Sequence, residues 1–144
     1  MKRYFYSIIL GVLLIFSAVC AASASSLYTA DENKDGKPDQ WYNMDSKTVR
    51  HLEADRNFDG KVDYIADFNE KGKMVSQKFD YNYDGVMDDF YYYKDGVLEK
   101  QEIDSNYDTK IDIWIYLYKG VYIKKYEKDT DHDGKPDIIK DYEK

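Results

Sequence analysis

Acidic and amide side chains recur at fixed spacing in five segments of this chain. Each segment has nine residues, with Asp at positions 1, 5 and 9 and Asn or Asp at position 3. We call these segments loops one to five, and they begin at Asp31, Asp55, Asp80, Asp104 and Asp129. Successive starts are therefore 24 or 25 residues apart. Oxygen-bearing side chains at one spacing, repeated five times, predict an array of sites for a hard cation.

Calcium is the cation that this pattern favours. Ca²⁺ takes six to eight oxygen ligands in flexible geometry, and side chains at loop positions 1, 3 and 5 can converge on one point. Glycine at position 6 allows the positive φ that reverses the chain, after which the position 7 carbonyl faces inward and Asp at position 9 closes the site, directly or through water. Magnesium demands stricter octahedral geometry, and a ligand set without His or Cys disfavours zinc and copper.

The predicted ligands number five in each loop, with the backbone carbonyl as the donor at position 7. They are Asp31, Asn33, Asp35, Lys37 and Asp39; Asp55, Asn57, Asp59, Lys61 and Asp63; Asp80, Asn82, Asp84, Val86 and Asp88; Asp104, Asn106, Asp108, Lys110 and Asp112; and Asp129, Asp131, Asp133, Lys135 and Asp137. Up to five calcium ions are expected. Loop four departs most from the pattern, because the β-branched Thr109 replaces glycine at position 6.

An explanation without metal is also open. Asp, Asn and Gly are ordinary turn formers, and Asx-turns could account for loops of this composition. That explanation does not predict Asp at position 9 in all five loops, and clustering carboxylates without a counter-ion costs repulsion. If calcium binds, affinity in the extracellular range of roughly 10⁻⁴ to 10⁻³ M is expected, because no bidentate Glu closes the loop.

The segments between the loops have the composition of β-strands. An aromatic or β-branched run follows each loop, as in Phe90 to Tyr93 and Ile113 to Tyr118, and no stretch of 12 residues keeps a helical period. Turns are expected at Lys71-Gly72, Asp95-Gly96 and Lys119-Gly120. The predicted fold is all-β: a meander of about five strand–turn–strand–Asp-loop units, with a β-solenoid as the alternative. In a meander, all turns would lie at one edge and all Asp loops at the other. The last repeat is expected to end as a single edge strand after Ile138.

The loops resemble known calcium loops. The Asp-x-Asn/Asp-x-Asp-Gly core looks like the first half of an EF-hand or dockerin loop, but both of those continue into a helix with an acidic residue at position 12. Here position 12 is Tyr42, Ala66, Tyr91, Ile115 or Lys140. The closer likeness is to the calcium loops of integrin-type FG-GAP repeats, which join two strands of a hairpin. Those repeats are about sixty residues long, so the likeness covers the loops and flanking strands and not the whole architecture.

The N-terminus predicts export. Lys2 and Arg3 precede an apolar run, and Ala22-Ser23-Ala24 offers a cleavage site, so residues 1–24 are expected to form a signal peptide with a helical apolar segment. Residues 25–144 are then a single repeat domain. Cys20, the only cysteine, is a possible lipidation site, although Val19 fits that poorly; the alternative is that Cys20 leaves with the signal. The expected location is extracytoplasmic: periplasmic, secreted or envelope-associated.

Charge and side-chain inventory narrow the function. Cleavage changes the formal charge from −7 to −9, because 21 − 2 = 19 basic residues face 28 acidic ones, and such a surface repels nucleic acid. Contact with a membrane is expected only through a lipid on Cys20.

No catalytic residues are predicted, and an enzyme is not expected. We expect rings at position 4 to pack on neighbouring repeats and Trp41, Phe90 and Trp114 to lie in the core. The predicted function is a calcium-stabilised surface for an unknown protein or glycan, and the alternative is a metal-independent envelope spacer or lipoprotein.

Overall fold

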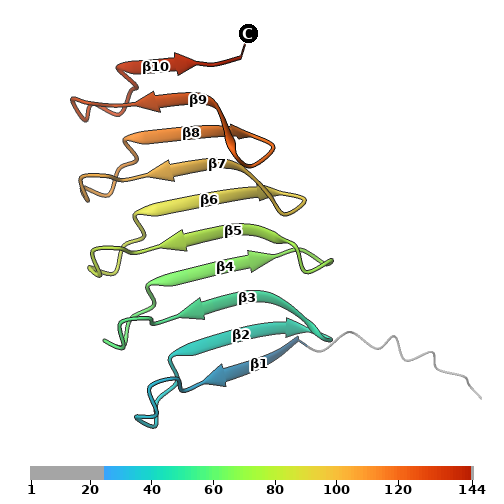
Figure 1. Cartoon of the computed structure of the whole chain (residues 1–144). Helices are drawn as coiled ribbons and strands as arrows, with labels where there is room; N and C mark the ends of the chain where they lie inside the picture. The colour runs from blue at the N-terminus through green and yellow to red at the C-terminus, as the bar shows by residue number, and fades with distance from the viewer. Residues whose placement is uncertain (1–24, 144) are drawn as a thin grey trace, which may run out of the picture.

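The structure, a computed structural model, describes residues 25–143 as one antiparallel sheet of ten strands whose order in space follows their order in sequence (Figure 1). The strands are β1 (Ser25–Ala30), β2 (Gln40–Asp45), β3 (Thr48–Ala54), β4 (Tyr64–Phe68), β5 (Met74–Phe79), β6 (Asp89–Lys94), β7 (Val97–Ile103), β8 (Ile113–Tyr118), β9 (Tyr122–Lys128) and β10 (Ile138–Asp141). The predicted signal segment and Cys20 lie outside the described residues.

The connections confirm the meander. The five Asp loops join β1 to β2, β3 to β4, β5 to β6, β7 to β8 and β9 to β10, and all lie at one edge of the sheet, while the short turns lie at the other (Figure 1). The solenoid alternative is wrong, because each strand pairs antiparallel with its neighbour in sequence and not parallel with the equivalent strand of the next repeat. The last repeat does end in a single edge strand, β10, as predicted.

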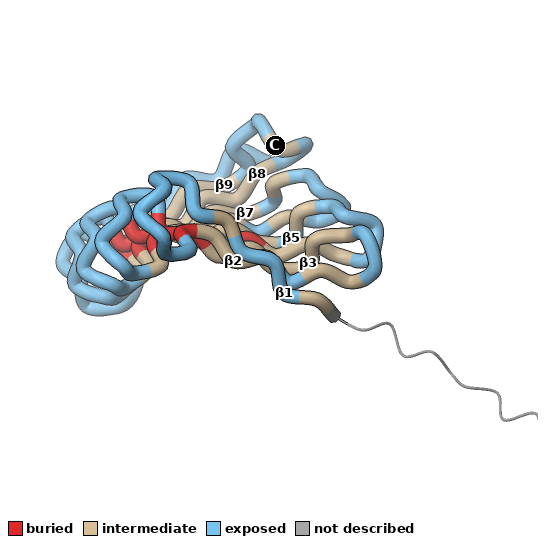
Figure 2. Tube along the Cα trace, turned by 90° about the horizontal axis from the view of Figure 1, so that it is seen from below, coloured by how far each residue is buried: buried red, intermediate tan, exposed pale blue. Residues whose placement is uncertain are grey.

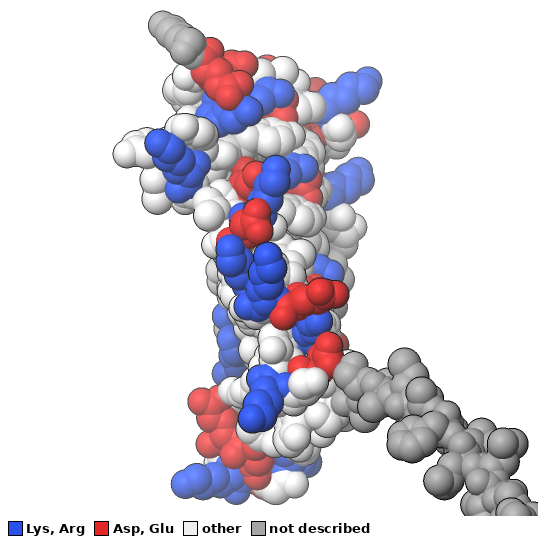
Figure 3. All heavy atoms as spheres, turned by 90° about the vertical axis from the view of Figure 1, so that its right-hand side faces the viewer, with Lys and Arg blue, Asp and Glu red and all other residues white. Residues whose placement is uncertain are grey.

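The turn edge is built from residues in the left-handed region. Asp95 and Gly96 both have positive φ, 53° and 81°, which is the type I′ geometry that matches the twist of a hairpin. Ser46 begins the first turn with a φ of 57° and has no glycine after it, so sequence patterns did not mark it. Figure 3, which faces this edge, shows Lys and Arg interspersed with Asp and Glu. Mixed charge of this kind keeps a sheet edge soluble without creating a one-sign field.

The sheet is a single layer, so it has almost no hydrophobic interior. Among residues 25–143, the buried apolar residues are Ala54 and Ala66. The prediction that Trp41, Phe90 and Trp114 form a core is therefore wrong: each is only half-buried on a sheet face. No second layer packs on either face within the described chain, and the rings cover their own strands and cross-strand neighbours instead.

The two faces differ in chemistry. Strand pairing places Tyr42, Leu52, Tyr64, Phe79, Tyr91, Ile103, Ile115 and Tyr126 on one face, which we call the apolar face. The opposite, charged face carries ion pairs within single strands, such as Lys100 with Glu102 on β7 and Lys125 with Glu127 on β9, at 2.5 and 2.7 Å. Lys100 also lies 5.4 Å from the ring centre of Tyr116, so aliphatic stems and aromatic rings cover the sheet between the charges.

Phe79 is the centre of an aromatic cluster on the apolar face. Its ring lies 4.9 Å from that of Tyr64, 5.4 Å from Tyr81 and 5.6 Å from Tyr91, and the Arg56 guanidinium lies 5.1 Å from its centre. These contacts join strands β4, β5 and β6 to loops two and three. A single ring therefore ties the middle of the sheet to the loop edge.

The described residues, 25–143, contain no helix of the length and apolarity needed to cross a bilayer.

Replacing Phe79 by Ala should lower the free energy of unfolding by about 2 kcal/mol, because a half-buried ring loses both its apolar burial and its aromatic contacts. Denaturant unfolding monitored by circular dichroism measures this. The control is Tyr122→Ala, which removes a ring that is 65% exposed and should change stability by less than about 0.5 kcal/mol. Equal effects of the two substitutions would contradict the packing described here.

Candidate metal centre

All five Asp loops share one backbone conformation. Position 6 has positive φ in every loop, between 90° and 98° where it is glycine and 73° at Thr109. Position 4 is also left-handed, with φ between 61° and 64°, and its residues are Lys34, Phe58, Tyr83, Tyr107 and His132. Positive φ at position 6 was predicted from the glycines there. Positive φ at position 4 was not predicted, because the rings at that position were interpreted as packing residues. Loop four keeps the common shape although Thr109 pays a steric cost for it.

The position 1 carboxylate organises each loop. Its Oδ2 accepts the position 6 N–H at 2.7 to 2.9 Å in all five loops, and its Oδ1 accepts the N–H of position 4 or 5. In loop three, Asp80 receives Tyr83 N–H at 2.7 Å and Gly85 N–H at 2.8 Å. Two left-handed residues turn these N–H groups inward, which is why the chain can wrap around one carboxylate.

The other acidic positions repeat in the same way. The position 9 Oδ2 accepts the position 2 N–H at 2.7 to 3.2 Å in every loop. The position 3 side-chain oxygen accepts the position 5 N–H, and the position 5 carboxylate accepts the position 7 N–H. These short-range bonds are Asx-type contacts, so the turn-forming role weighed from composition is real. Each carboxylate oxygen has further acceptor capacity beyond one N–H, which leaves it able to serve a cation as well.

Adjacent loops are joined directly through their backbones. The position 1 N–H of each following loop donates to the position 9 carbonyl of the loop before it, as in Asp55 to Asp39 at 2.8 Å and Asp80 to Asp63 at 3.0 Å. The joined residues are buried, each with at most 4% of its surface exposed: Asp39, Asp55, Asp63, Asp80, Asp88, Asp104, Asp112 and Asp129. Figure 2 shows buried segments gathered beside the loop edge. We call these eight residues the aspartate column.

The aspartate column has little positive charge beside it. Within residues 25–143, ion pairs reach two of its members: Arg56 contacts Asp63, and His132 Nδ1 lies 3.9 Å from Asp112. Arg56 occupies position 2 of loop two and was not singled out from the sequence, because position 2 has no common residue type. It is the one built-in guanidinium of the loops, and it partly neutralises loop two without an ion.

The pKa shifts show where the carboxylates are least satisfied. Burial raises the pKa of Asp88, N–H groups of Tyr81 and Asn82 counteract this only in part, and the nearby charges of Asp80 and Asp84 raise it further. At Asp129, burial also opposes ionisation, but the N–H groups of Gly134 and His132 outweigh it and the pKa is lowered. Of these two carboxylates, Asp88 in loop three is therefore the one that lacks compensating charge.

Loop five brings its acids closest together. Oxygens of Asp129, Asp131 and Asp137 all lie within 4.8 Å of one another, a separation compatible with ligands of one cation, while Asp133 is outside this group. The other loops have Asn at position 3, so none of them can form the same group of three carboxylates. Convergence of position 5 and the inward position 7 carbonyl of Lys135 stay predictions.

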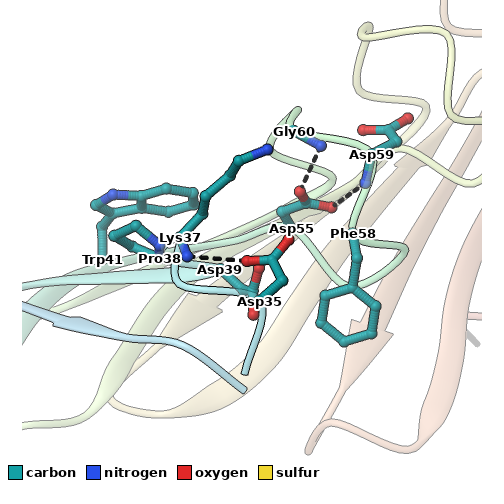
Figure 4. A pocket seen from close by; sticks show the side chains of 9 residues that line it. All are labelled: Asp35, Lys37, Pro38, Asp39, Trp41, Asp55, Phe58, Asp59 and Gly60. Atoms are coloured by element: carbon teal, nitrogen blue, oxygen red, sulfur yellow. Dashed lines mark hydrogen bonds between the residues drawn. The ribbon is translucent and has the colours of Figure 1, made fainter. Parts of the chain in front are cut away.

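A hollow of about 390 Å³ separates loops one and two (Figure 4). Its lining includes Asp35 and Asp39 from loop one and Asp55 and Asp59 from loop two, together with the Phe58 ring. In Figure 4, the Asp55 carboxylate receives bonds from Gly60 and Asp59. The hollow is thus lined by carboxylates of successive loops, and Lys37, Pro38 and Trp41 also line it.

The position 4 rings pack less closely than predicted. Phe58, Tyr83 and Tyr107 are 46%, 43% and 50% exposed, although Phe58 does line the hollow beside the neighbouring loop. His132 contacts the loop before it, with its Nδ1 2.9 Å from the Asn106 amide nitrogen. Packing on the neighbouring repeat is therefore partial, and the rings of Phe58, Tyr83 and Tyr107 each stay about half-exposed.

The charged face holds a polar cluster that the sequence did not reveal. His51 Nδ1 lies 2.7 Å from Asp67, and Ser76 Oγ donates to the same carboxylate at 2.7 Å. Strand register brings these residues together on β3, β4 and β5, so only the pairing of strands could have predicted it. Ser76 contacts the Asp and not the His, which is not the order of a nucleophile and its base.

A scan against protein-family models finds no match, and neither does a search of curated protein sequences. Among solved structures, the chain is similar in fold to a chain in the crystal structure of accessory secretory protein 1, 2 and 3 in Streptococcus pneumoniae, with a TM-score of 0.50 at 14% identity. The match covers 87% of this chain but only 22% of that one, so this chain spans about a fifth of its length. At this identity the likeness describes the fold alone.

Loop strain at position 6 predicts opposite effects of two substitutions. Thr109→Gly should stabilise the metal-free protein by about 1 kcal/mol, because glycine adopts positive φ without steric cost. Gly60→Thr should destabilise it by a similar amount, because a β-branched residue is strained at positive φ, whereas a Cβ at Gly60 would meet nothing within 4 Å. Thermal unfolding in chelator tests both, and a stabilising effect of Gly60→Thr would contradict the loop geometry.

The His51 cluster predicts a pH dependence. Burial lowers the pKa of His51, but the carboxylates of Asp67 and Glu53 outweigh it and raise the pKa above 6.5. The imidazolium therefore adds stability that is fully present below pH 6.5 and lost as pH rises through the folded pKa. His51→Gln should cost up to about 1 kcal/mol at pH near 6 and less at pH near 9. An equal cost at both values, measured by urea unfolding, would show that the charge on His51 contributes nothing.

Proposed function

We propose that this chain is an exported calcium-binding β-repeat protein in which ions held by the Asp loops stabilise a single-layer sheet as a contact surface for a protein or glycan. The observation that carries the proposal is the aspartate column. Eight carboxylates are buried along one edge, and ion pairs in the described residues reach only Asp63 and Asp112. Buried carboxylates without positive partners are costly, and a divalent cation in each loop removes that cost.

The donor set fits calcium. Carboxylate and amide oxygens recur at the same positions of five loops that share one conformation, and in loop five three carboxylates already lie within 4.8 Å of one another. The raised pKa of Asp88, caused first by burial and then by Asp80 and Asp84, is the electrostatic signature of a site that lacks positive charge. Residues at positions 1, 3 and 9 would hold the ion, and those at positions 5 and 7 would complete its shell.

Export and location rest on the N-terminal sequence. Its charged start, apolar run and Ala22-Ser23-Ala24 support a cleaved signal, with a lipid on Cys20 as the alternative. An extracytoplasmic environment, where calcium is abundant, suits loops of modest affinity. Half-exposed rings at position 4 would give the loop edge a surface suited to stacking on a partner.

A metal-independent structural spacer is the second candidate. One observation favours it: within the described residues, no buried side-chain nitrogen or oxygen atom lacks a hydrogen-bond partner. Backbone N–H groups can therefore supply the hydrogen bonds that the loop oxygens need. What they do not supply is a full positive charge to balance the carboxylates. The two candidates differ in whether that charge costs measurable stability.

Asp88→Asn separates the two candidates. Asparagine keeps an acceptor for the N–H groups of Tyr81 and Asn82 but removes the negative charge of the Asp88 carboxylate, the group whose pKa is raised. In chelator the variant should be as stable as the parent protein or more so. With calcium at ten to a hundred times its dissociation constant, the variant should lack one site's stabilisation, about 1.4 to 2.7 kcal/mol. Thermal unfolding of residues 25–144 in chelator and in calcium measures both quantities, with magnesium as the comparison ion.

Asp89→Asn is the matched control. Asp89 is the next residue in sequence, its pKa is also raised by burial, and its side chain bonds Gln101 and Tyr91 on the apolar face, outside the loop. It should leave the calcium-induced rise intact. Identical melts of the parent protein in chelator and calcium would reject calcium binding and leave the spacer.

A further inference from the structure

The first and last strands of the sheet, β1 and β10, each have one side without a partner strand among the described residues, and these two open edges differ in kind. β1 precedes an Asp loop, as β3, β5, β7 and β9 do, whereas β10 follows one, as β2, β4, β6 and β8 do. Inside the sheet, every strand of the second kind pairs through a hairpin with a strand of the first kind. The free side of β10 would therefore pair with a strand that precedes an Asp loop, and β1 of a second copy is such a strand.

The loop edge is incomplete at the same two places. Position 1 is buried in loops two to five but exposed at Asp31, and position 9 is buried in loops one to four but exposed at Asp137. Where two loops are adjacent, the position 1 N–H of the later loop donates to the position 9 carbonyl of the earlier one. The two residues that form this bond are buried between the loops. Asp31 lacks a preceding loop and Asp137 a following one within the described chain, so the two ends carry complementary halves of one contact.

The internal register predicts how the ends would meet. The residue after each loop pairs with the residue before the next one, as Ile113 does with Lys128. Applied to the open edges, this rule sets Ile138 opposite Ala30, Ile139 opposite Thr29 and Lys140 opposite Tyr28 of a second copy. The result continues the sheet across two chains.

The outer side of β1 is unprotected, while β10 is short and carries two charged residues, Lys140 and Asp141. β1 has no charged residue or proline, and its Leu27 and Tyr28 are 70% and 54% exposed. β10 has four exposed residues, with Ile139 58% exposed, and its charges are limited to Lys140 and Asp141. Unpaired strands of this kind template the addition of another strand. The turn edge and both sheet faces offer no such row of free backbone groups.

From these observations we propose that copies of this chain associate head to tail, with β10 of one copy pairing antiparallel with β1 of the next and Asp137 of the first loop array contacting Asp31 of the second. The contact is heterologous, so it does not close after two copies and generates an open linear array. Each added copy continues the aspartate column. This proposal concerns the strand edges and does not require calcium in the loops.

Sedimentation velocity of untagged residues 25–144 tests the proposal between about 10 µM and 1 mM, in calcium and in chelator. The weight-average mass should rise with concentration beyond twice that of the monomer, without a plateau at the dimer. Tyr28→Lys places a Lys opposite Lys140 and should weaken association at least about tenfold. Adding Lys140→Glu to Tyr28→Lys should restore it, because every junction then pairs opposite charges.

Val121→Lys is the control, since it adds the same charge at a 71% exposed turn residue away from both edges, and it should associate like the parent protein. Melting curves confirm that each variant folds. A monomer at every concentration would overturn the proposal, as would a plateau at the dimer or association that Tyr28→Lys leaves unchanged. If association persists in chelator while calcium has no effect on stability, the assembly stands and the proposed calcium function falls.

Discussion

A buried carboxylate needs either hydrogen bonds and a positive charge or a reason to be neutral, and this constraint governs the whole loop edge. The sheet cannot rely on a hydrophobic interior, since Ala54 and Ala66 are the buried apolar residues of the described chain. What lies between its repeats instead is the aspartate column, joined by backbone bonds such as Asp55 to Asp39. The proposed function rests on how the charge of that column is balanced.

In the loops, different groups supply hydrogen bonds to the carboxylates and positive charge to balance them. Two left-handed residues in each loop direct N–H groups at the position 1 carboxylate, which satisfies its geometry. In loop two the charge is balanced by Arg56, whereas in loop four the nearest group is the His132 ring, 3.9 Å from Asp112. In the proposed function a divalent cation would serve the remaining loops, and it would stabilise an extended single layer without disulfides. The apolar face, centred on Phe79, then supplies local packing between neighbouring strands.

Periodicity in the sequence was enough to predict much of this arrangement. Loop boundaries, the meander, the placement of loops and turns at opposite edges and the terminal edge strand all follow from a 24- or 25-residue repeat with period-2 segments between its loops. β1 was missed, because Ser25 to Ala30 has a single aromatic residue and precedes the first repeat. The core prediction for Trp41 and Trp114 failed because large rings indicate burial only if a second layer exists. The Arg56–Asp63 contact within loop two and the His51 cluster across three strands were missed, because composition does not encode such contacts.

Amide chemical shifts of the glycines test the central claim most directly, in a calcium titration followed by ¹H–¹⁵N NMR. Gly36, Gly60, Gly85 and Gly134 each donate their N–H to a position 1 carboxylate, whereas Gly72, Gly96 and Gly120 lie in the turns at the opposite edge. If the loops hold calcium, the four loop glycines shift and saturate at roughly 10⁻⁴ to 10⁻³ M while the three turn glycines stay in place. Loop glycines that do not move at millimolar calcium, or that move no more than the turn glycines, would contradict calcium binding by the aspartate column.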